Sequence, residues 1–291
     1  SSSEYTATVA IPISRAVRMT RTAISPRLAI RIFFNTAYYL YLMNTLSPNQ
    51  PENTSSWPNG WWVSVVAETG STNTDLLASA HGGAEHHSVL MAKFQSAGKG
   101  RLDRTWVAEP GSNLLVSLLF RFADTMVRPT HQFTQIVGMA AALASEQLVA
   151  VKPQMKWPND LLIDGKKVSG ILAQGAADFV VVGIGINVGW APPDAVSLNS
   201  ASGNVQTTPT DLLRAMLGHI DVLESLDPAQ LHARYVAHLM TLGQEVRVEM
   251  ANHVVTGRAS SVLMDGRLEV VDDNGQTHLI DTGDVVHLRA Q

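Results

Sequence analysis

Two kinds of hydrophobic pattern divide this 291-residue chain, and that division is the strongest constraint on its fold. Between Trp61 and Leu239, short apolar runs alternate with segments whose apolar residues recur at helical spacing, most clearly over 132–149. After Gly243 only short apolar runs follow, separated by turn signals such as Asn274-Gly275, the dipeptide preferred in two-residue hairpins. The chain is therefore predicted to be α+β, ending in about 48 residues of closely spaced strands that form a small closed barrel.

The expected elements follow from these patterns. Strands are predicted over 61–67, 88–94, 113–122, 155–162, 168–174, 179–188, 246–250, 254–263, 267–271, 278–281 and 285–288. Helices are predicted to begin at Asp75, after a cap at Ser71 or Thr72, and to span 132–149, 209–219 and 229–239. Three regions result: an extension and linker over 1–58, a large domain over 59–241, and the barrel over 242–291.

Composition narrows the kinds of site and partner. The chain has no cysteine, which excludes disulfides, thiolate metal sites and a cysteine nucleophile and fits a reducing, cytoplasmic location. A net charge of -4 gives no reason to expect a nucleic-acid or membrane partner. The nearest candidate for a spanning helix, Ala29 to Met43, is interrupted by Arg31 and Asn35 and is shorter than the roughly 20 residues needed.

The first 58 residues differ from the rest in charge. No acidic residue lies between Glu4 and Glu52, whereas five arginines lie between Arg15 and Arg31. This bias is typical of a targeting segment or a tail, and an ordinary structural segment is an equal alternative. The stretch 44–60, rich in Ser, Pro and Asn, is predicted to be a linker.

Three histidines, His81, His86 and His87, lie close together in a polar loop that contains glycine. Their spacing matches no helical ligand pattern such as H-E-x-x-H. A solvated loop is predicted here, and no metal site.

A basic, glycine-rich loop over 98–106 is the first candidate for chemistry. Its two glycines would let backbone N–H groups approach an anion closely, and Lys99, Arg101 and Arg104 add positive charge. Trp106 supplies a flat apolar face on which a purine could stack. The spacing matches neither the P-loop nor the dinucleotide fingerprint, so a solvated turn is the alternative.

The second candidate is the stretch 156–160, Lys-Trp-Pro-Asn-Asp. Its proline fixes the backbone just before Asn159 and Asp160. A predicted hairpin turn at Asp164-Gly165 brings Lys167 back alongside. A carboxylate beside a lysine suits proton or phosphate chemistry, and a surface hairpin with an ordinary ion pair is the alternative.

The third candidate is the stretch 183–188, Gly-Ile-Gly-Ile-Asn-Val, since glycines within a strand commonly mark the close approach of a ligand or another backbone. Together with the turn 71–73, Ser-Thr-Asn, the three clusters in this order and at these intervals closely resemble the biotin protein ligase family. The resemblance spans Trp61 to Arg289, and the pairing of Lys-Trp-Pro-Asn-Asp with the K-x-x-G-I-L stretch over 167–172 is quite specific.

This resemblance implies a fold and a reaction. The family has a catalytic domain with a mixed sheet, related to class II aminoacyl-tRNA synthetases and lipoate ligases, followed by a small SH3-like β-barrel. It implies that ATP and biotin are substrates, with Mg²⁺ expected, and that biotinyl-5′-AMP forms first. A lysine of a biotin carboxyl carrier domain, from a biotin-dependent carboxylase, then attacks the anhydride and AMP leaves. The ligase would act as a monomer or a homodimer.

Residue roles carry over position by position. The residues implied to bind biotin are Ser71, Thr72, Asn73, Gln95, Lys99, Gly100, Arg101, Lys167 and Gly170. Those implied to bind ATP or the adenylate are Lys99, Arg101, Arg104, Trp106, Asn159, Asp160, Lys167 and Asn187.

Three of these residues would be catalytic. Arg101 would hold the phosphate, Lys167 would hydrogen-bond the biotin carboxyl oxygen, and Asp160 would orient or deprotonate the incoming amine. Trp106 is expected to stack on adenine, and Asn187 to support the adenosine.

Two positions depart from the family pattern. Lys99 stands where arginine is usual, so the charge is kept but the planar bidentate fork is lost. Asp103 stands where glycine is usual, and this anion would either pair with Arg104 or weaken adenylate binding.

Three other functions remain as alternatives. Lipoate ligation uses the same fold, although the Ser-Thr-Asn turn and the K-x-x-G-I element favour biotin. A repressor that responds to biotinyl-AMP would need an N-terminal helix-turn-helix, and the stretch before Trp61 shows no such pattern. A binding module without catalysis is disfavoured by the retained Lys167, Arg101 and Asp160.

Overall fold

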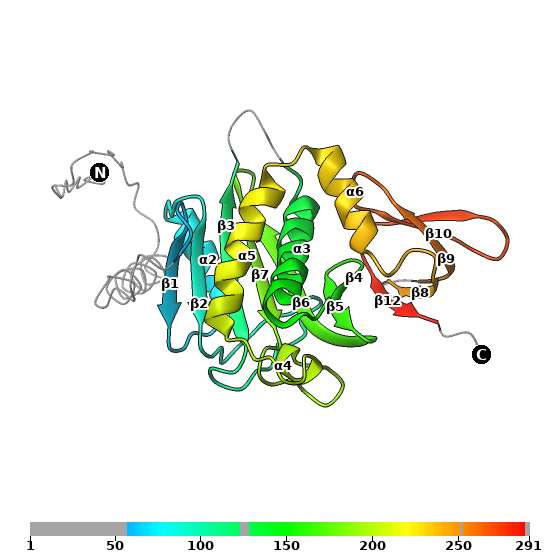
Figure 1. The fold of residues 1–291 in the computed structure, drawn as a ribbon. Helices are drawn as coiled ribbons and strands as arrows, with labels where there is room; N and C mark the ends of the chain where they lie inside the picture. The colour runs from blue at the N-terminus through cyan, green and yellow to red at the C-terminus, as the bar shows by residue number, and fades with distance from the viewer. Residues whose placement is uncertain (1–56, 123–127, 251–252, 289–291) are drawn as a thin grey trace, which may run out of the picture. The chain divides into compact units, whose positions relative to one another are not determined.

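The computed structural model describes residues 57–122, 128–250 and 253–288, all within one compact unit, Thr54–Gln291. The predicted N-terminal extension and most of its linker lie outside the described residues. A seven-stranded sheet occupies the first part of the described chain and a five-stranded sheet the last part (Figure 1). The predicted boundary at 241/242 falls between the two sheets and stays a prediction.

The large sheet is mixed, as predicted. Its strands are β1 (Trp62–Val66), β2 (Ser88–Ala92), β3 (Leu114–Arg121), β4 (Gln154–Lys156), β5 (Asp160–Ile163), β6 (Lys166–Gly175) and β7 (Phe179–Ile186). Their order is β1-β2-β3-β7-β6-β5-β4, in which β1 and β2 are parallel and every other pair is antiparallel. The central strand β3 is buried on both faces, which explains its continuous apolar run.

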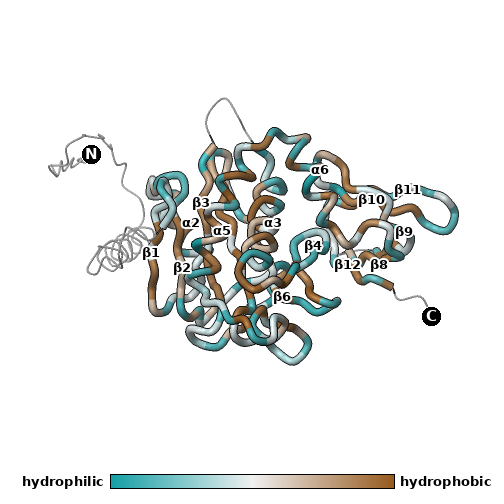
Figure 2. The backbone as a smooth tube through the Cα atoms, in the orientation of Figure 1, coloured by the Kyte–Doolittle hydropathy of each residue, from teal (hydrophilic) through white to brown (hydrophobic). Residues whose placement is uncertain are grey.

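Helices cover both faces of this sheet. They are α2 (Thr72–His81), α3 (Thr130–Val149), α4 (Leu198–Ala201), α5 (Pro209–Glu224) and α6 (Pro228–His238). Helix α2 contacts β3 and β7 on one face, and α3 and α5 lie on the other (Figure 1). Apolar residues concentrate in the strands and in α3, and polar residues in the turns (Figure 2). None of the described helices combines the length and hydropathy needed to cross a membrane.

Several boundaries differ from the sequence predictions. The single strand predicted over 155–162 is wrong: it is two strands, β4 and β5, joined by a turn at 157–159. Pro158 lacks the N–H that a strand interior would use, so the chain turns there. Helix α5 continues past the predicted end at 219 because its apolar spacing runs on to Leu223. Helix α2 begins at Thr72, earlier than Asp75, and α4 was not predicted.

The small sheet is antiparallel, with the order β11-β10-β9-β8-β12. Its strands are β8 (Glu245–Glu249), β9 (Val254–Val262), β10 (Leu268–Val271), β11 (Thr277–Ile280) and β12 (Asp284–His287). Buried and exposed residues alternate along β8 and most of β9, as expected for a sheet with one face on a core. The predicted small C-terminal β domain is confirmed as this antiparallel sheet, and within residues 245–287 no ladder joins β11 to β12.

Candidate active site

A cavity of about 300 Å³ lies on the α2 face of the large sheet. Every residue named above as a candidate for biotin or nucleotide binding lines this cavity. The loop 98–106, the 159–170 hairpin and the Gly-Ile-Gly-Ile-Asn strand therefore meet at one place. Their individual roles stay predictions, but the clustering of the three motifs is a feature of the fold.

Glycines leave the strands beneath the cavity without side chains at several positions. Ser117 of β3 pairs in register with Gly183 of β7, and Gly170 of β6 pairs with Gly185. A Cβ on Gly183 would lie 2.4 Å from Oδ1 of Asn73, and one on Gly185 would lie 2.4 Å from the indole of Trp106. The glycines therefore leave room for side chains from α2 and from the glycine-rich loop, which lie directly on the strands.

A buried hydrogen-bond network fixes the start of α2. The backbone N–H of Thr72 donates to Gln95 Oε1 at 2.7 Å, and the Thr72 hydroxyl lies 2.8 Å from that of Ser117. Ser117 donates to Asn73 Oδ1 at 2.8 Å, while Asn73 Nδ2 donates to Gln174 Oε1 at 2.9 Å. Because both ends of the Asn73 amide have partners, its orientation is set before any ligand arrives.

Two expectations about this turn need comment. Ser71 occupies the N-cap position of α2 with extended backbone, but its hydroxyl makes no capping hydrogen bond, so the predicted side-chain cap is wrong for this residue. Ser117 was missed by the sequence analysis, although it carried a signal: it is the one hydroxyl in the apolar run Leu114–Phe120.

The glycine-rich loop is a narrow hairpin. Gly100 N–H donates to the Arg104 carbonyl at 2.6 Å, Trp106 N–H donates to the Gly98 carbonyl at 2.9 Å, and a Cβ on Gly98 would lie 2.6 Å from the Trp106 carbonyl oxygen. The two glycines thus allow the arms of the hairpin to approach, in addition to any role toward an anion. Lys99 Nζ donates to Thr74 Oγ1 at 3.0 Å and ties the loop to α2.

The tip of the loop explains one departure from the family pattern. Asp103 has a φ of +57°, a left-handed conformation that glycine adopts freely. Aspartate tolerates this conformation better than most residues, so the loop keeps its shape. Arg104 pairs with Asp284 of β12 and not with Asp103, so the pairing considered from sequence is wrong.

Trp106 lies over the glycines of β6 and β7. Lys167 Nζ lies 5.9 Å from the centroid of its ring, a distance suited to a cation–π contact. The Trp106 Nε1 atom is buried and has no hydrogen-bond partner among the described residues. A ligand acceptor in the cavity would satisfy this donor. Whether the indole stacks on adenine stays a prediction.

Cations outnumber carboxylates around the cavity. Lys167 Nζ forms an ion pair with Asp160 Oδ1 at 2.7 Å, across the β5–β6 hairpin. Arg101 donates to Asn159 Oδ1 at 2.9 Å and to the Thr282 hydroxyl. Burial lowers the pKa of Arg101, against which the charges of Asp284 and Asp160 act. The charged lining residues are the cations Lys99, Arg101, Arg104 and Lys167 and the carboxylates Asp160 and Asp284. This excess of positive charge suits an anionic ligand.

Asn187 is held at the end of β7. Its Oδ1 accepts from Asn113 Nδ2 at 3.3 Å, and its Nδ2 donates to the Val196 carbonyl at 3.3 Å. Asn113, which the sequence analysis missed, also accepts from the backbone N–H groups of Val188 and Trp190. The pair fixes the chain beyond β7, and Asn187 reaches the cavity from there.

The histidine cluster lies apart from the residues that line this cavity. His81 and His86 are exposed as expected, but His87 is mostly buried, stacks on Trp61 at 3.9 Å and lies 2.8 Å from Glu224, so a fully solvated loop is wrong. His86, His87 and Glu224 have potential metal-ligand atoms within 4.8 Å of one another. The two imidazoles are stacked at 3.7 Å.

Comparisons with known families and proteins agree with this geometry. Residues 65–189 match the biotin/lipoate A/B protein ligase family, and residues 241–288 match the biotin protein ligase C terminal domain. The biotin--[acetyl-CoA-carboxylase] ligase of Mycobacterium tuberculosis is 40% identical over 244 residues, covering 79% of this chain and 91% of the relative. The ligase of the same name from Paracoccus denitrificans is 31% identical, covering 72% of this chain and 91% of the relative.

Solved structures give the same fold. The biotin protein ligase from Aquifex aeolicus in complex with biotin and ATP superposes with a TM-score of 0.66 at 24% identity. The match covers 79% of this chain and 99% of the other. At this identity the likeness concerns the fold alone.

Proposed function

This chain belongs to the biotin protein ligase family, and we propose that it converts biotin and ATP to biotinyl-5′-AMP and transfers the biotin to a lysine of a biotin carboxyl carrier domain. The observation that carries the proposal is the convergence of the three motifs on one cation-rich cavity. Hydrogen-bonded polar side chains at the start of α2 line one part of that cavity, and the cations of the loop 98–106 line another. A ligand with a polar ring at one end and an anion at the other fits this arrangement.

The first step must bring two anions together. A carboxylate and a phosphate about 4 Å apart repel by about 4 kcal/mol at the effective dielectric of a protein surface. Lys167 and Arg101 both line the cavity and offset this repulsion. The Lys167 ammonium would donate to the biotin carboxyl oxygen while the other oxygen attacks the α-phosphate, and pyrophosphate would leave. Mg²⁺ would enter with ATP as part of that substrate.

The second step needs a neutral amine beside the anhydride. Asp160 lies across the hairpin from Lys167, so its carboxylate would face the same carbonyl and accept a proton from the carrier lysine. Its ion pair with Lys167 fixes the position of the carboxylate, and the two residues would act together. AMP would leave as the amide bond forms.

The test is exchange of labelled pyrophosphate into ATP, run in parallel with biotin and with lipoate. Exchange with biotin only supports the proposal, whereas exchange with lipoate only would reassign the acyl substrate while keeping the reaction type. Exchange with neither would contradict an adenylating enzyme. Transfer is then followed as biotin attached to an isolated carrier domain.

Two variants separate the proposed roles. Lys167→Ala should abolish most biotin-dependent exchange, whereas Arg101→Ala should retain a larger part of the exchange but release biotinyl-AMP, which then labels lysines of a bystander protein. Lys166→Ala is the matched control, because Lys166 is the exposed neighbour on the same strand. Equal loss of exchange in the Lys167 and Arg101 variants would contradict this division.

A further inference from the structure

We propose that the turn between β11 and β12 belongs to this site: Thr282 and Asp284 are positioning residues that hold Arg101 and Arg104, and so keep the loop 98–106 closed over the bound adenylate. The identity of the enclosed ligand rests on the proposed function. The contact between the loop and the small sheet does not.

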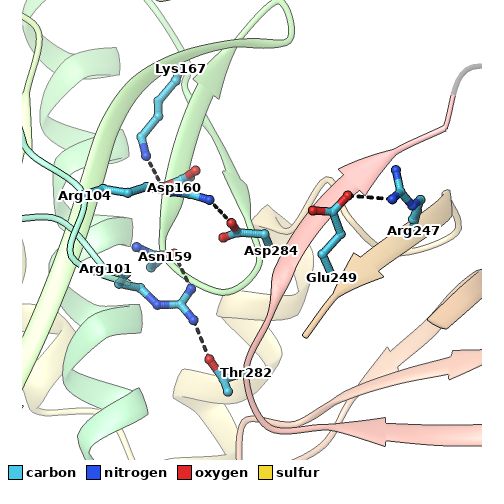
Figure 3. Close-up of polar contacts among 9 residues, drawn as sticks. All are labelled: Arg101, Arg104, Asn159, Asp160, Lys167, Arg247, Glu249, Thr282 and Asp284. Atoms are coloured by element: carbon cyan, nitrogen blue, oxygen red, sulfur yellow. Dashed lines mark hydrogen bonds and ion pairs between the residues drawn. The ribbon is translucent and has the colours of Figure 1, made fainter. Parts of the chain in front are cut away.

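The contact joins parts of the chain that are far apart in sequence. The Arg104 guanidinium pairs with the Asp284 carboxylate, and the Arg101 guanidinium donates to the Thr282 hydroxyl (Figure 3). Asp284 also lines the cavity itself. The two arginines of the loop are therefore held by two residues of one turn in the small sheet.

Strand pairing in the small sheet fixes the position of this turn. Asp284 pairs in register with Glu249 of β8, so its backbone position is fixed by the β8–β12 ladder. A Cβ on Gly283 would lie 2.6 Å from Cγ1 of Val248, so only glycine lets the turn lie this close to β8. Thr282 and Asp284 flank that glycine and extend toward the loop (Figure 3).

A neighbouring ion pair shows that only one of two adjacent carboxylates contacts the loop 98–106. Glu249 pairs with Arg247 of its own strand at 3.0 Å, within the small sheet (Figure 3). Asp284 and Glu249 are register partners, but their carboxylates have different ion-pair partners. Glu249 pairs within the small sheet, whereas Asp284 pairs with the loop 98–106. This makes Glu249 a matched control.

Contacts from outside the loop 98–106 help to fix the backbone conformation of its tip. Leu102 and Asp103 at its tip both have positive φ, at +54° and +57°, which costs energy for residues other than glycine. Arg101 is partly desolvated, which lowers its pKa, and the Asp284 charge is the strongest of the interactions that act against this lowering. A single carboxylate at 284 therefore contacts one loop arginine and stabilises the charge of the other.

The size of the effect follows from exposure. The Arg104 side chain is 65% exposed and that of Asp284 is 28% exposed, so solvent screens the pair in part. The loop also keeps its contacts to Thr74 and Asn159 when Asp284 is neutralised. We expect a change of about threefold to fivefold in loop opening, which is the upper part of the range for a partly screened pair.

The experiment compares Asp284→Asn, Asp284→Glu and Glu249→Gln in the full chain. Without ligand, trypsin should cut after Arg101 about threefold to fivefold faster in Asp284→Asn than in the unsubstituted protein. Asp284→Glu keeps the charge and should restore slow cleavage, and Glu249→Gln should not differ. Preformed biotinyl-AMP should leave Asp284→Asn faster by a similar factor, and the difference should shrink at about 1 M salt, because the pair includes a mostly exposed arginine and salt weakens exposed ion pairs.

The outcomes separate this proposal from the proposed function. Unchanged cleavage in Asp284→Asn, or equal acceleration in Glu249→Gln, would overturn the positioning role even if biotin-dependent exchange is normal. Faster cleavage that Asp284→Glu reverses, in a protein without biotin-dependent exchange, would uphold the loop contact and contradict the proposed function. A difference in release that is as large at high salt as at low salt would show loss of structure in place of a lost ion pair, and would also overturn the role.

Discussion

Replacing Gly185 by alanine tests why the strand beneath the cavity contains glycine. The new Cβ would lie 2.4 Å from Cε2 of Trp106, and ordinary contact begins at 3.4 Å, so the indole must retreat by 3.4 − 2.4 = 1.0 Å. Gly185 itself is held between paired strands on both sides, so the strand cannot move instead. Overpacking of this kind typically costs about 1–3 kcal/mol. We expect urea unfolding to show a loss in this range, together with loss of most biotin-dependent exchange.

A double-mutant cycle identifies the cause. In a Trp106→Ala background the three atoms nearest the Cβ at position 185 are gone, and alanine in a strand is about 0.5–1 kcal/mol more favourable than glycine, so Gly185→Ala should then be neutral or stabilising. The coupling between the two sites should be about 1–3 kcal/mol. Gly218→Ala, at a helical position with nothing within 4 Å, is the control and should stabilise the fold. An equal cost of Gly185→Ala in both backgrounds would refute the reasoning.

Three further changes have outcomes set by single contacts. Ser117→Ala removes the donor to a buried amide oxygen and should lower the free energy of unfolding by about 1–3 kcal/mol. Ser145→Ala, which removes an equally buried hydroxyl bonded to a carbonyl of its own helix, should cost less, and equal costs in urea would contradict this account. Asp103→Gly relieves a φ of +57° and should slow the release of biotinyl-AMP, so faster release would show that the carboxylate itself helps closure. The hydrogen bond from His278 holds the pKa of Asp272 below its ordinary value, so its stabilising effect is present above the unfolded pKa of about 3.9 and is lost as the pH falls through the folded pKa. The stability gap between the unsubstituted protein and Asp272→Asn should therefore be wider in urea at pH 6 than at pH 3.5, and a constant gap would exclude this linkage.

The elements that sequence predicted best are those whose environment is uniform along their length. The runs 113–122 and 179–188 gave strands close to β3 and β7, because both are buried central strands that need apolar residues at nearly every position. A hairpin turn lies at Asn274-Gly275 as expected, but its loop is longer than two residues: the Asp272 N–H donates to the Gln276 carbonyl, and of the dipeptide Gly275 alone has a positive φ, at +78°. The prediction failed at Pro158, where one continuous pattern hid two short strands and a turn.

Residues that line the cavity were predicted where they are close in sequence, and those that line it or contact its loop from far along the chain were missed. The motifs around Lys99 and Asn159 each lie within a few residues, so their spacing carried information. Thr282 and Asp284 lie about 180 positions from the arginines that they contact, in a stretch whose local pattern indicates only a turn. No spacing rule links the two segments, because their meeting depends on how the small sheet lies against the loop.

The weakest motif in sequence is the one that explains most of the site. Glycine at 183 and 185 is two residues apart, so both lie on one face of β7, and the isoleucine between them faces the core under α3. The two glycines supply no side-chain atoms of their own. The absence of side chains there leaves room for Asn73 from the start of α2 and for Trp106 from the loop 98–106. Asn73 and Trp106 can lie on this strand only because positions 183 and 185 lack side chains, so the glycine alternation gains meaning only beside the other two motifs.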